Sequence, residues 1–214
     1  MNKKNIELFF QRLAELNPNP KPELKYNSPF ELLVAVILSA QATDNSVNKA
    51  TAELFKVAKN PEEFINLGEE KLKDYIKSIG LFNTKAKNII KTAKIIKEKY
   101  NNKIPDNLKD LEQLAGVGRK TANVILNVIY QKPTLAVDTH IFRIANRIGL
   151  ATGKTTLEVE NNLLKVIPKK YLLNAHHWLI LHGRYICTAK KLNCLKCPVY
   201  DLCEYENKIN KYKE

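Results

Sequence analysis

The apolar residues of this chain recur at the spacing of amphipathic helices. Ile141, Ile144, Ala145 and Ile148 follow an i, i+3, i+4, i+7 pattern, which places them on one face of a helix. Comparable stripes occur in other segments: Ile6, Phe9, Phe10 and Leu13; Phe30, Leu33, Val34, Ile37 and Leu38; Ile89, Ile90, Ala93 and Ile96; and Ala175, Trp178, Leu179 and His182. No segment shows the sustained alternation of a strand between turns. The pattern therefore predicts an all-α protein.

Prolines and glycines mark where the predicted helices begin and end. Residues 17–29 hold four prolines, which predict a non-helical connector, and the last of them, Pro29, is expected to begin a helix. Gly116 and Gly118 separate two further helices. In the helix around Ile89, the basic side chains are expected on the outer face.

The composition adds a strongly basic charge. The 214 residues include 35 Lys and Arg against 22 Asp and Glu, a formal net charge of +13 at pH 7. A basic surface attracts polyanions and releases their counterions, so nucleic acid is the favoured partner and an anionic membrane surface the second choice. Uncharged runs such as Leu32 to Thr43 are shorter than the ~18 residues of a membrane span. The N-terminal segment does not resemble a signal peptide, so we expect an intracellular protein.

The four cysteines lie close together near the end of the chain. Cys187, Cys194, Cys197 and Cys203 have six, two and five residues between neighbours. Cytosolic thiols stay reduced, so this cluster predicts a metal site rather than disulfides. Zinc and a cubane iron–sulfur cluster both accept four thiolates. The chain has one C-x-x-C pair where zinc sites usually have two, which favours iron–sulfur but leaves zinc open. Lys191 lies among these cysteines and is a candidate phosphate contact.

A short turn with two glycines joins two of the predicted helices. Gly116 and Gly118 at its ends allow positive φ and the close approach of a phosphate to the backbone. The N–H groups of Val117, Gly118 and the next helical turn are expected to point outward at the positive end of the helix dipole. This pattern is typical of a helix–hairpin–helix, which binds DNA phosphates without reading sequence. An ordinary glycine-capped turn is the alternative, but the Arg119–Lys120 pair argues against it because cations are disfavoured at a helix start.

Two residues in this region have a chemical interpretation. The helix dipole and Arg119 both oppose protonation of Lys120, and a neutral amine is the nucleophile in Schiff-base chemistry. Asp138 precedes an apolar-periodic helix, so it is predicted to cap that helix. The same carboxylate can act as a base or as the countercharge of a cationic sugar transition state.

Together these motifs resemble the endonuclease III family of the helix–hairpin–helix DNA glycosylase superfamily, whose members are bifunctional glycosylase/lyases. The resemblance extends over nearly the whole chain and includes the spacing of the cysteines. It rests on the segments Leu38–Asp44, Ile79–Asn83, Gly116–Ala122, Val137–His140 and His177–Arg184. Because the family carries a [4Fe–4S] cluster on this loop, the resemblance decides between zinc and iron–sulfur in favour of the cluster.

The resemblance implies a role for each candidate residue. Lys120 corresponds to the nucleophile and Asp138 to the assisting carboxylate. Gln41 and Leu81 correspond to residues that fill the gap left by a flipped nucleotide. The implied DNA contacts are Gln41, Leu81, Gly116, Val117, Gly118, Arg119 and Lys191, and the implied cluster ligands are Cys187, Cys194, Cys197 and Cys203.

The resemblance also implies the domain organisation and the reaction. A six-helix domain is expected at residues 22–132, with the helix–hairpin–helix at 108–130. A second helical domain is expected from residues 1–21 and 133–214, with the cluster loop at 187–203 and the active-site cleft between the two domains. The implied function is base-excision repair: removal of oxidised pyrimidines and β-elimination at the resulting or pre-existing abasic site. The expected partner is double-stranded DNA containing such lesions, bound by a monomer in the cytoplasm, at the nucleoid in a bacterium.

Two alternatives differ in activity. An adenine-removing relative with the same cluster lacks lysine at the position of Lys120 and carries an extra C-terminal domain, whereas this sequence ends at Glu214. A metal-stabilised DNA-binding module without activity would explain the charge, the hairpin and the cysteines. It would not explain a lysine placed where protonation is opposed.

Overall fold

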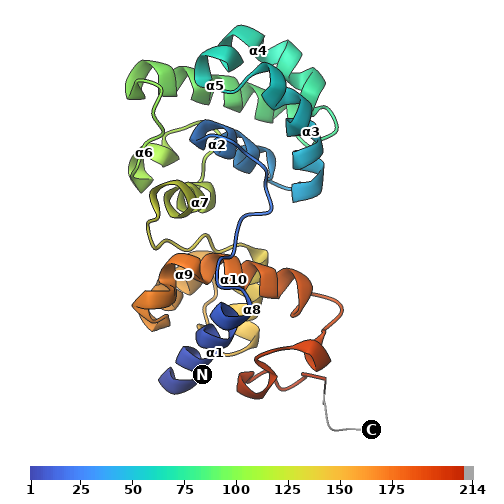
Figure 1. The fold of residues 1–214 in the computed structure, drawn as a ribbon, viewed down its shortest axis with the longest axis vertical. Coiled ribbons are helices and arrows are strands. Elements are labelled where there is room, and N and C mark those ends of the chain that lie inside the picture. Colours follow the sequence, from blue (N-terminus) through green and yellow to red (C-terminus); the bar gives the residue numbers. More distant parts are fainter. Residues whose placement is uncertain (210–214) are drawn as a thin grey trace. The chain divides into compact units, whose positions relative to one another are not determined.

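The computed structural model describes residues 1–209 and consists mainly of helices (Figure 1). Over that range, strand-like pairing is limited to one isolated bridge between Cys187 and Leu192. The prediction of an all-α fold is confirmed. The chain divides into two compact units, residues 22–130 and residues 1–21 with 131 onwards. Residues 210–214 of the expected C-terminal domain lie outside the described part. None of the helices in the described part is long and apolar enough to cross a membrane.

The unit of residues 22–130 is built around α2. Its helices are α2 (Pro29–Leu38), α3 (Asp44–Val57), α4 (Pro61–Ile76), α5 (Phe82–Tyr100), α6 (Leu108–Glu112) and α7 (Arg119–Tyr130). Every residue from Phe30 to Leu38 is buried, and α2 contacts α3, α5 and α7. The helix begins at Pro29 as predicted, with the Ser28 hydroxyl accepting a hydrogen bond from the Glu31 amide. This apolar helix is buried on all sides, which explains its lack of a polar face.

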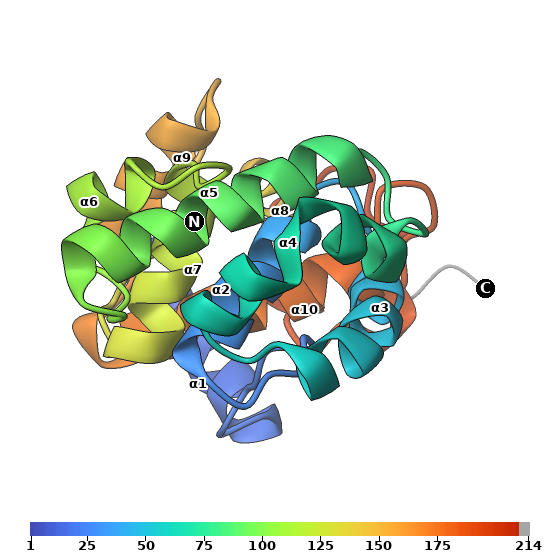
Figure 2. The same cartoon turned by 90° about the horizontal axis from the view of Figure 1, so that it is seen from above.

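α5 is the longest helix of this unit and lies beside α4 (Figure 2). Its buried residues are Lys85, Ala86, Ile89, Ile90, Thr92, Ala93 and Ile96. The expectation that the basic side chains of this helix face outward holds for Lys91 and Lys94, which are exposed. It is wrong for Lys85, which lies inside the unit.

The other unit combines the N-terminal helix with the last third of the chain. It contains α1 (Lys3–Leu16), α8 (Thr139–Arg147), α9 (Thr156–Val166), α10 (Leu172–Tyr185) and the short 3-10 helices η1 (Lys169–Tyr171), η2 (Cys194–Lys196) and η3 (Tyr200–Leu202). α10 contacts both α8 and α1. The predicted stripes form its core, in which Phe10, Ile144 and Trp178 are buried. The Trp178 indole N–H donates to the Asn17 carbonyl at 2.8 Å, so this buried donor is satisfied.

Candidate functional site

The glycine turn lies between α6 and α7 and is anchored by the buried side chains of Leu114 and Val117. Gly116 has a φ of +78°, and a Cβ there would lie 3.0 Å from Nδ2 of Asn88. Gly118 is not among the glycines with positive φ, so of the two glycines only Gly116 uses the conformation that both allow. A Cβ at Gly118 would meet no atom within 4 Å, so the backbone is open to a ligand at this position.

The backbone amides of the turn differ in whether they are hydrogen-bonded within the protein. The Val117 amide donates to the Leu114 carbonyl at 3.1 Å, so the expectation that it points outward is wrong. The Ala122 amide donates to the Gly118 carbonyl at 2.9 Å, which is the first hydrogen bond of the α7 ladder. The helix therefore supplies no partner for the amides of Gly118, Lys120 and Thr121. These amides lie at the positive end of α7, where an anionic oxygen is a favourable acceptor.

Lys120 is the second residue of α7, and its side chain is exposed. It follows the open backbone of Gly118 by two residues, and the neighbouring Arg119 is exposed as well. The arrangement places an accessible amine beside amides that suit a phosphate. A ligand held by the turn would thus have an exposed amine within the same helical turn.

Asp138 is the N-cap of α8, as predicted. Its Oδ1 accepts a hydrogen bond from the Ile141 amide at 2.8 Å, and the side chain is half-buried. The preceding residues 135–137 are buried, which fixes the position of the backbone that carries the carboxylate. Asp138 belongs to the unit with the cysteines, and Lys120 belongs to the unit with the glycine turn.

Gln41 and Leu81 are both exposed residues with left-handed backbone. Gln41 lies shortly after α2 with a φ of 55°, and Leu81 directly precedes α5 with a φ of 60°. The Leu81 side chain is 61% exposed. Left-handed backbone costs a non-glycine residue about 1–3 kcal/mol and persists only where the surroundings enforce it. Two exposed, strained positions of this kind indicate a role at the surface rather than in the core.

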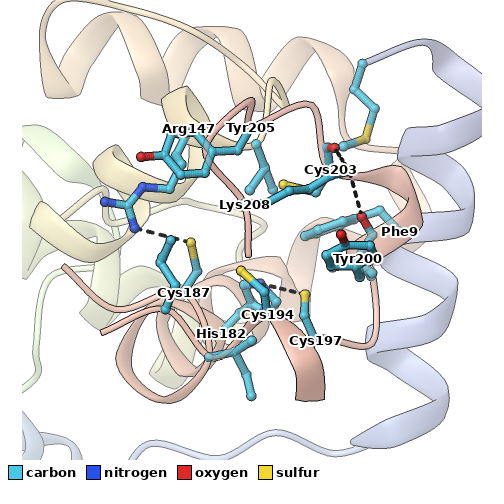
Figure 3. A pocket seen from close by; sticks show the side chains of 15 residues that line it. Phe9, Arg147, His182, Cys187, Cys194, Cys197, Tyr200, Cys203, Tyr205 and Lys208 are labelled. Carbon is cyan, nitrogen blue, oxygen red and sulfur yellow. Dashed lines mark hydrogen bonds between the residues drawn. The ribbon is translucent and has the colours of Figure 1, made fainter. Parts of the chain in front are cut away.

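The four cysteines line a single cavity in the other unit (Figure 3). Cys187 lies just after α10, Cys194 begins η2, and Cys197 and Cys203 directly follow η2 and η3. The whole cavity, which eleven other residues also line, has an empty volume of ≈ 440 Å³ with its open side included. Phe9 of α1 also lines the cavity, so distant parts of the sequence enclose it.

Burial disfavours free thiolates in this cavity. It raises the pKa of Cys197 to about 11 and also raises the pKa of Cys203. The four thiols that line the cavity are the donor type of a thiolate-bound metal centre, in which metal–thiolate bonds would offset the cost of deprotonation. Within residues 1–209, no three Cys, His, Asp or Glu side chains stand close enough to hold a metal ion as they are placed.

Three residues beside the cysteines were not singled out as site residues from the sequence. Arg143 donates to the Cys187 carbonyl at 3.1 Å, and Arg147 donates to the Cys187 sulfur at 3.5 Å. His182 Nε2 lies 3.9 Å from the Cys197 sulfur, and burial lowers the pKa of His182 to about 4. The one available signal was the four-residue spacing of the two arginines, which places both on one face of α8.

The helical fold and the glycine turn define a class of protein. Residues 34–169 match the model of the HhH-GPD superfamily base excision DNA repair proteins. The chain is 59% identical over 210 residues to endonuclease III of Haemophilus influenzae, covering 98% of this chain and 99% of that protein. It is 56% identical over 211 residues to endonuclease III of Escherichia coli strain K12, covering 98% and 100%.

Solved structures give the same result. A trapped endonuclease III–DNA covalent intermediate, an estranged-adenine complex, matches with a TM-score of 0.89 at 42% identity. A non-covalent endonuclease III–DNA complex matches with a TM-score of 0.89 at 41% identity, and both matches cover 95% of this chain and 96% of the other. The chain therefore belongs to the endonuclease III family, and the resemblance noted in the sequence is confirmed. It is a base-excision repair enzyme, a DNA glycosylase with abasic-site lyase activity.

Proposed function

We propose that this chain removes oxidised pyrimidines from double-stranded DNA and cleaves the strand at the abasic site through a Schiff base on Lys120. The observation that carries the proposal is the position of this amine. Lys120 is exposed in the first turn of α7, two residues after the open backbone of Gly118. A phosphate bound by the turn would bring the attached sugar close to the nucleophile.

The reaction begins with a nucleotide rotated out of the duplex, because the base–sugar bond is inaccessible in the stack. The neutral Lys120 amine attacks C1′, the C1′–N bond breaks, and the base leaves with the electron pair and takes up a proton. Opening of the sugar gives an imine between the lysine nitrogen and C1′. Loss of a proton from C2′ then expels the 3′ phosphate with the electron pair of the C3′–O bond. Water hydrolyses the imine and regenerates the amine.

Asp138 provides the negative charge for base departure. Its Oδ1 accepts the capping bond from Ile141, the one hydrogen bond of this carboxylate within residues 1–209. The second carboxylate oxygen is left to face a cationic sugar or to accept a proton. The capping bond would also fix the orientation of the group before substrate binds.

The DNA contacts combine backbone and side chains. Gln41 and Leu81 would enter the space left by the flipped nucleotide. The amides at Gly118 and Arg119 would bind phosphate, while Gly116 and Val117 shape the turn, Gly116 through its φ and Val117 through its buried side chain. Lys191 is exposed on the cysteine loop, where its amide donates to the Thr188 hydroxyl at 3.1 Å, and it would add a further phosphate contact.

The four cysteines would hold a [4Fe–4S] cluster. Its iron–thiolate bonds would order residues 187–203, which offer few apolar side chains for a core of their own. Of these, Leu195 is itself 61% exposed. The cluster supports the loop in this proposal, and each step of base removal and strand cleavage is assigned to side chains of the chain. The enzyme is proposed to act as a monomer in the cytoplasm.

A duplex with a single oxidised pyrimidine tests the proposal. We expect release of the free base and a strand break on the 3′ side of the lesion, with neither product from the undamaged duplex. Release of adenine from a mispaired duplex instead would support the adenine-removing alternative. Binding without any product would support the DNA-binding module.

A further inference from the structure

One face of α5 connects the two strained surface residues with the glycine turn. Leu81 directly precedes the helix, and Lys85, Asn88 and Thr92 follow it at +4, +7 and +11. This spacing keeps all of them on one side of the helix. We call Lys85, Asn88 and Thr92 the inner face of α5.

Lys85 fixes the segment that carries Gln41. Its side chain is buried, with 5% exposed, and Nζ donates to the carbonyls of Leu38 at 2.9 Å and Ala40 at 2.6 Å. Leu38 ends α2, and Ala40 directly precedes Gln41. A cation is favourable at the negative end of a helix dipole, and lysine side chains can bond the last carbonyls of a helix. Burial lowers the pKa of Lys85, because removal from water disfavours the charged form of the amine.

The rest of the inner face fixes the glycine turn. Thr92 is 1% exposed, and its hydroxyl donates to the Ala115 carbonyl at 2.9 Å. The Asn88 side chain lies against Gly116, whose left-handed φ reverses the chain direction. Ala115 and Gly116 lie two to three residues before the open backbone at Gly118. Thr92 and Asn88 therefore fix the position of that backbone.

We infer that α5 is a rigid support that sets the distance between the gap-filling residues and the phosphate-binding turn, with Lys85 and Thr92 as its positioning residues. The inference rests on the proposed function, which assigns gap filling to Gln41 and Leu81 and phosphate binding to the turn. From Leu81 to Thr92 the chain rises about 16 Å at 1.5 Å per residue, a distance over which a helix curves only gently. Lys85 therefore acts on gap filling, and Thr92 acts on phosphate binding.

The experiment compares substitutions on this helix in two assays. Lys85→Met keeps the length of the side chain but removes its donor and charge, and Lys94→Met removes an exposed charge from the same helix as a matched control. Gap filling is followed by the fluorescence of 2-aminopurine opposite a stable abasic analogue, which rises when the base is unstacked. Phosphate binding is followed by the affinity for undamaged duplex.

We expect Lys85→Met and Gln41→Ala to lose most of the fluorescence rise per bound complex, while Lys94→Met keeps it. Excision from duplex should fall by about ten- to a hundredfold in Lys85→Met, because small displacements of positioning groups have effects of this size. The Lys85→Met/Gln41→Ala double variant should be no worse than Gln41→Ala, since both act on one contact. Thr92→Val should keep the fluorescence rise and bind damaged and undamaged duplex more weakly.

Single-stranded abasic DNA separates this inference from the proposed function. Borohydride trapping on it needs the Lys120 amine but no gap filling, so Lys85→Met should trap as the wild type does. Failure of the wild type to trap would reject the proposed function. A trapping-competent Lys85→Met protein with full fluorescence rise and full duplex excision would overturn the inference alone. Lys85→Gln is the milder second variant, and loss of helical circular dichroism in both Lys85 variants would limit Lys85 to folding and also overturn the inference.

Discussion

Alanine at Gly116 and alanine at Gly118 should change stability in opposite directions. The left-handed φ of Gly116 costs a residue with a side chain about 1–2 kcal/mol. The new Cβ would also lie 3.0 Å from Nδ2 and 3.2 Å from Cβ of Asn88, so that side chain must shift. Alanine also lowers the conformational entropy of the unfolded chain, which stabilises the folded state by about 0.4–1 kcal/mol. With the displacement of Asn88 included, Gly116→Ala should lower the free energy of unfolding by about 1–2 kcal/mol.

Gly118→Ala lacks both costs. The φ of Gly118 is ordinary, and no atom lies within 4 Å of the added Cβ. The free energy of unfolding should therefore rise by about 0.4–1 kcal/mol, because alanine restricts the unfolded chain. The methyl group would occupy the space through which a phosphate approaches the backbone. Loss of one hydrogen bond to a charged oxygen costs about 1.5–3 kcal/mol, so Kd for DNA should rise roughly ten- to a hundredfold.

Thermal unfolding and fluorescence anisotropy measure the two effects. In a chain of this size, 1 kcal/mol shifts Tm by about 2–4 °C. Tm should therefore fall in Gly116→Ala and rise slightly in Gly118→Ala, while DNA affinity falls in the second variant without any loss of folding. An unchanged Tm in Gly116→Ala would refute the assigned backbone geometry. Wild-type affinity in Gly118→Ala would place the phosphate elsewhere.

Three further substitutions test other parts of the account. Asp138→Asn keeps an N-cap, so Tm should stay unchanged. Base excision should fall by on the order of a hundredfold or more, with the lyase step less affected. Equal losses in the two assays would contradict the proposed roles. Lys191→Glu should lower the slope of log Kd against log salt by roughly one unit, and an unchanged slope would remove Lys191 from the DNA contacts. The purified protein should be yellow-brown with about four irons per chain, and Cys194→Ser should fold poorly, whereas a colourless protein with stoichiometric zinc would overturn the cofactor.

The helices were predictable because burial of one face leaves a periodic trace in the sequence. Ile141, Ile144 and Ala145 lie buried on α8 as their spacing requires, and Pro29 begins α2. The N-cap at Asp138 followed from the residue type and its place before that stripe. Features that depend on a single helix, such as its buried face and its N-cap, could therefore be predicted from the sequence.

Features that depend on turn dihedrals or on packing between helices were not predictable. The inward hydrogen bond of Val117 and the ordinary φ of Gly118 reflect how the turn closes, which residue order does not specify. The burial of Lys85 arises because α5 passes the end of α2, and a lysine in a basic helix gives no sign of this. The contact between Arg147 and Cys187 likewise requires α8 to meet the cysteine loop.

Borohydride trapping on a duplex with one abasic site tests the central claim most directly, because reduction converts the imine into a stable bond between protein and DNA. The wild type and the exposed-lysine variant Lys94→Gln should both give the covalent adduct, and peptide mapping should locate it at Lys120. Lys120→Gln should give no adduct while still binding the duplex, since the hairpin amides remain. Normal trapping by Lys120→Gln, or an adduct mapped to another residue, would contradict the assignment of Lys120 as the nucleophile.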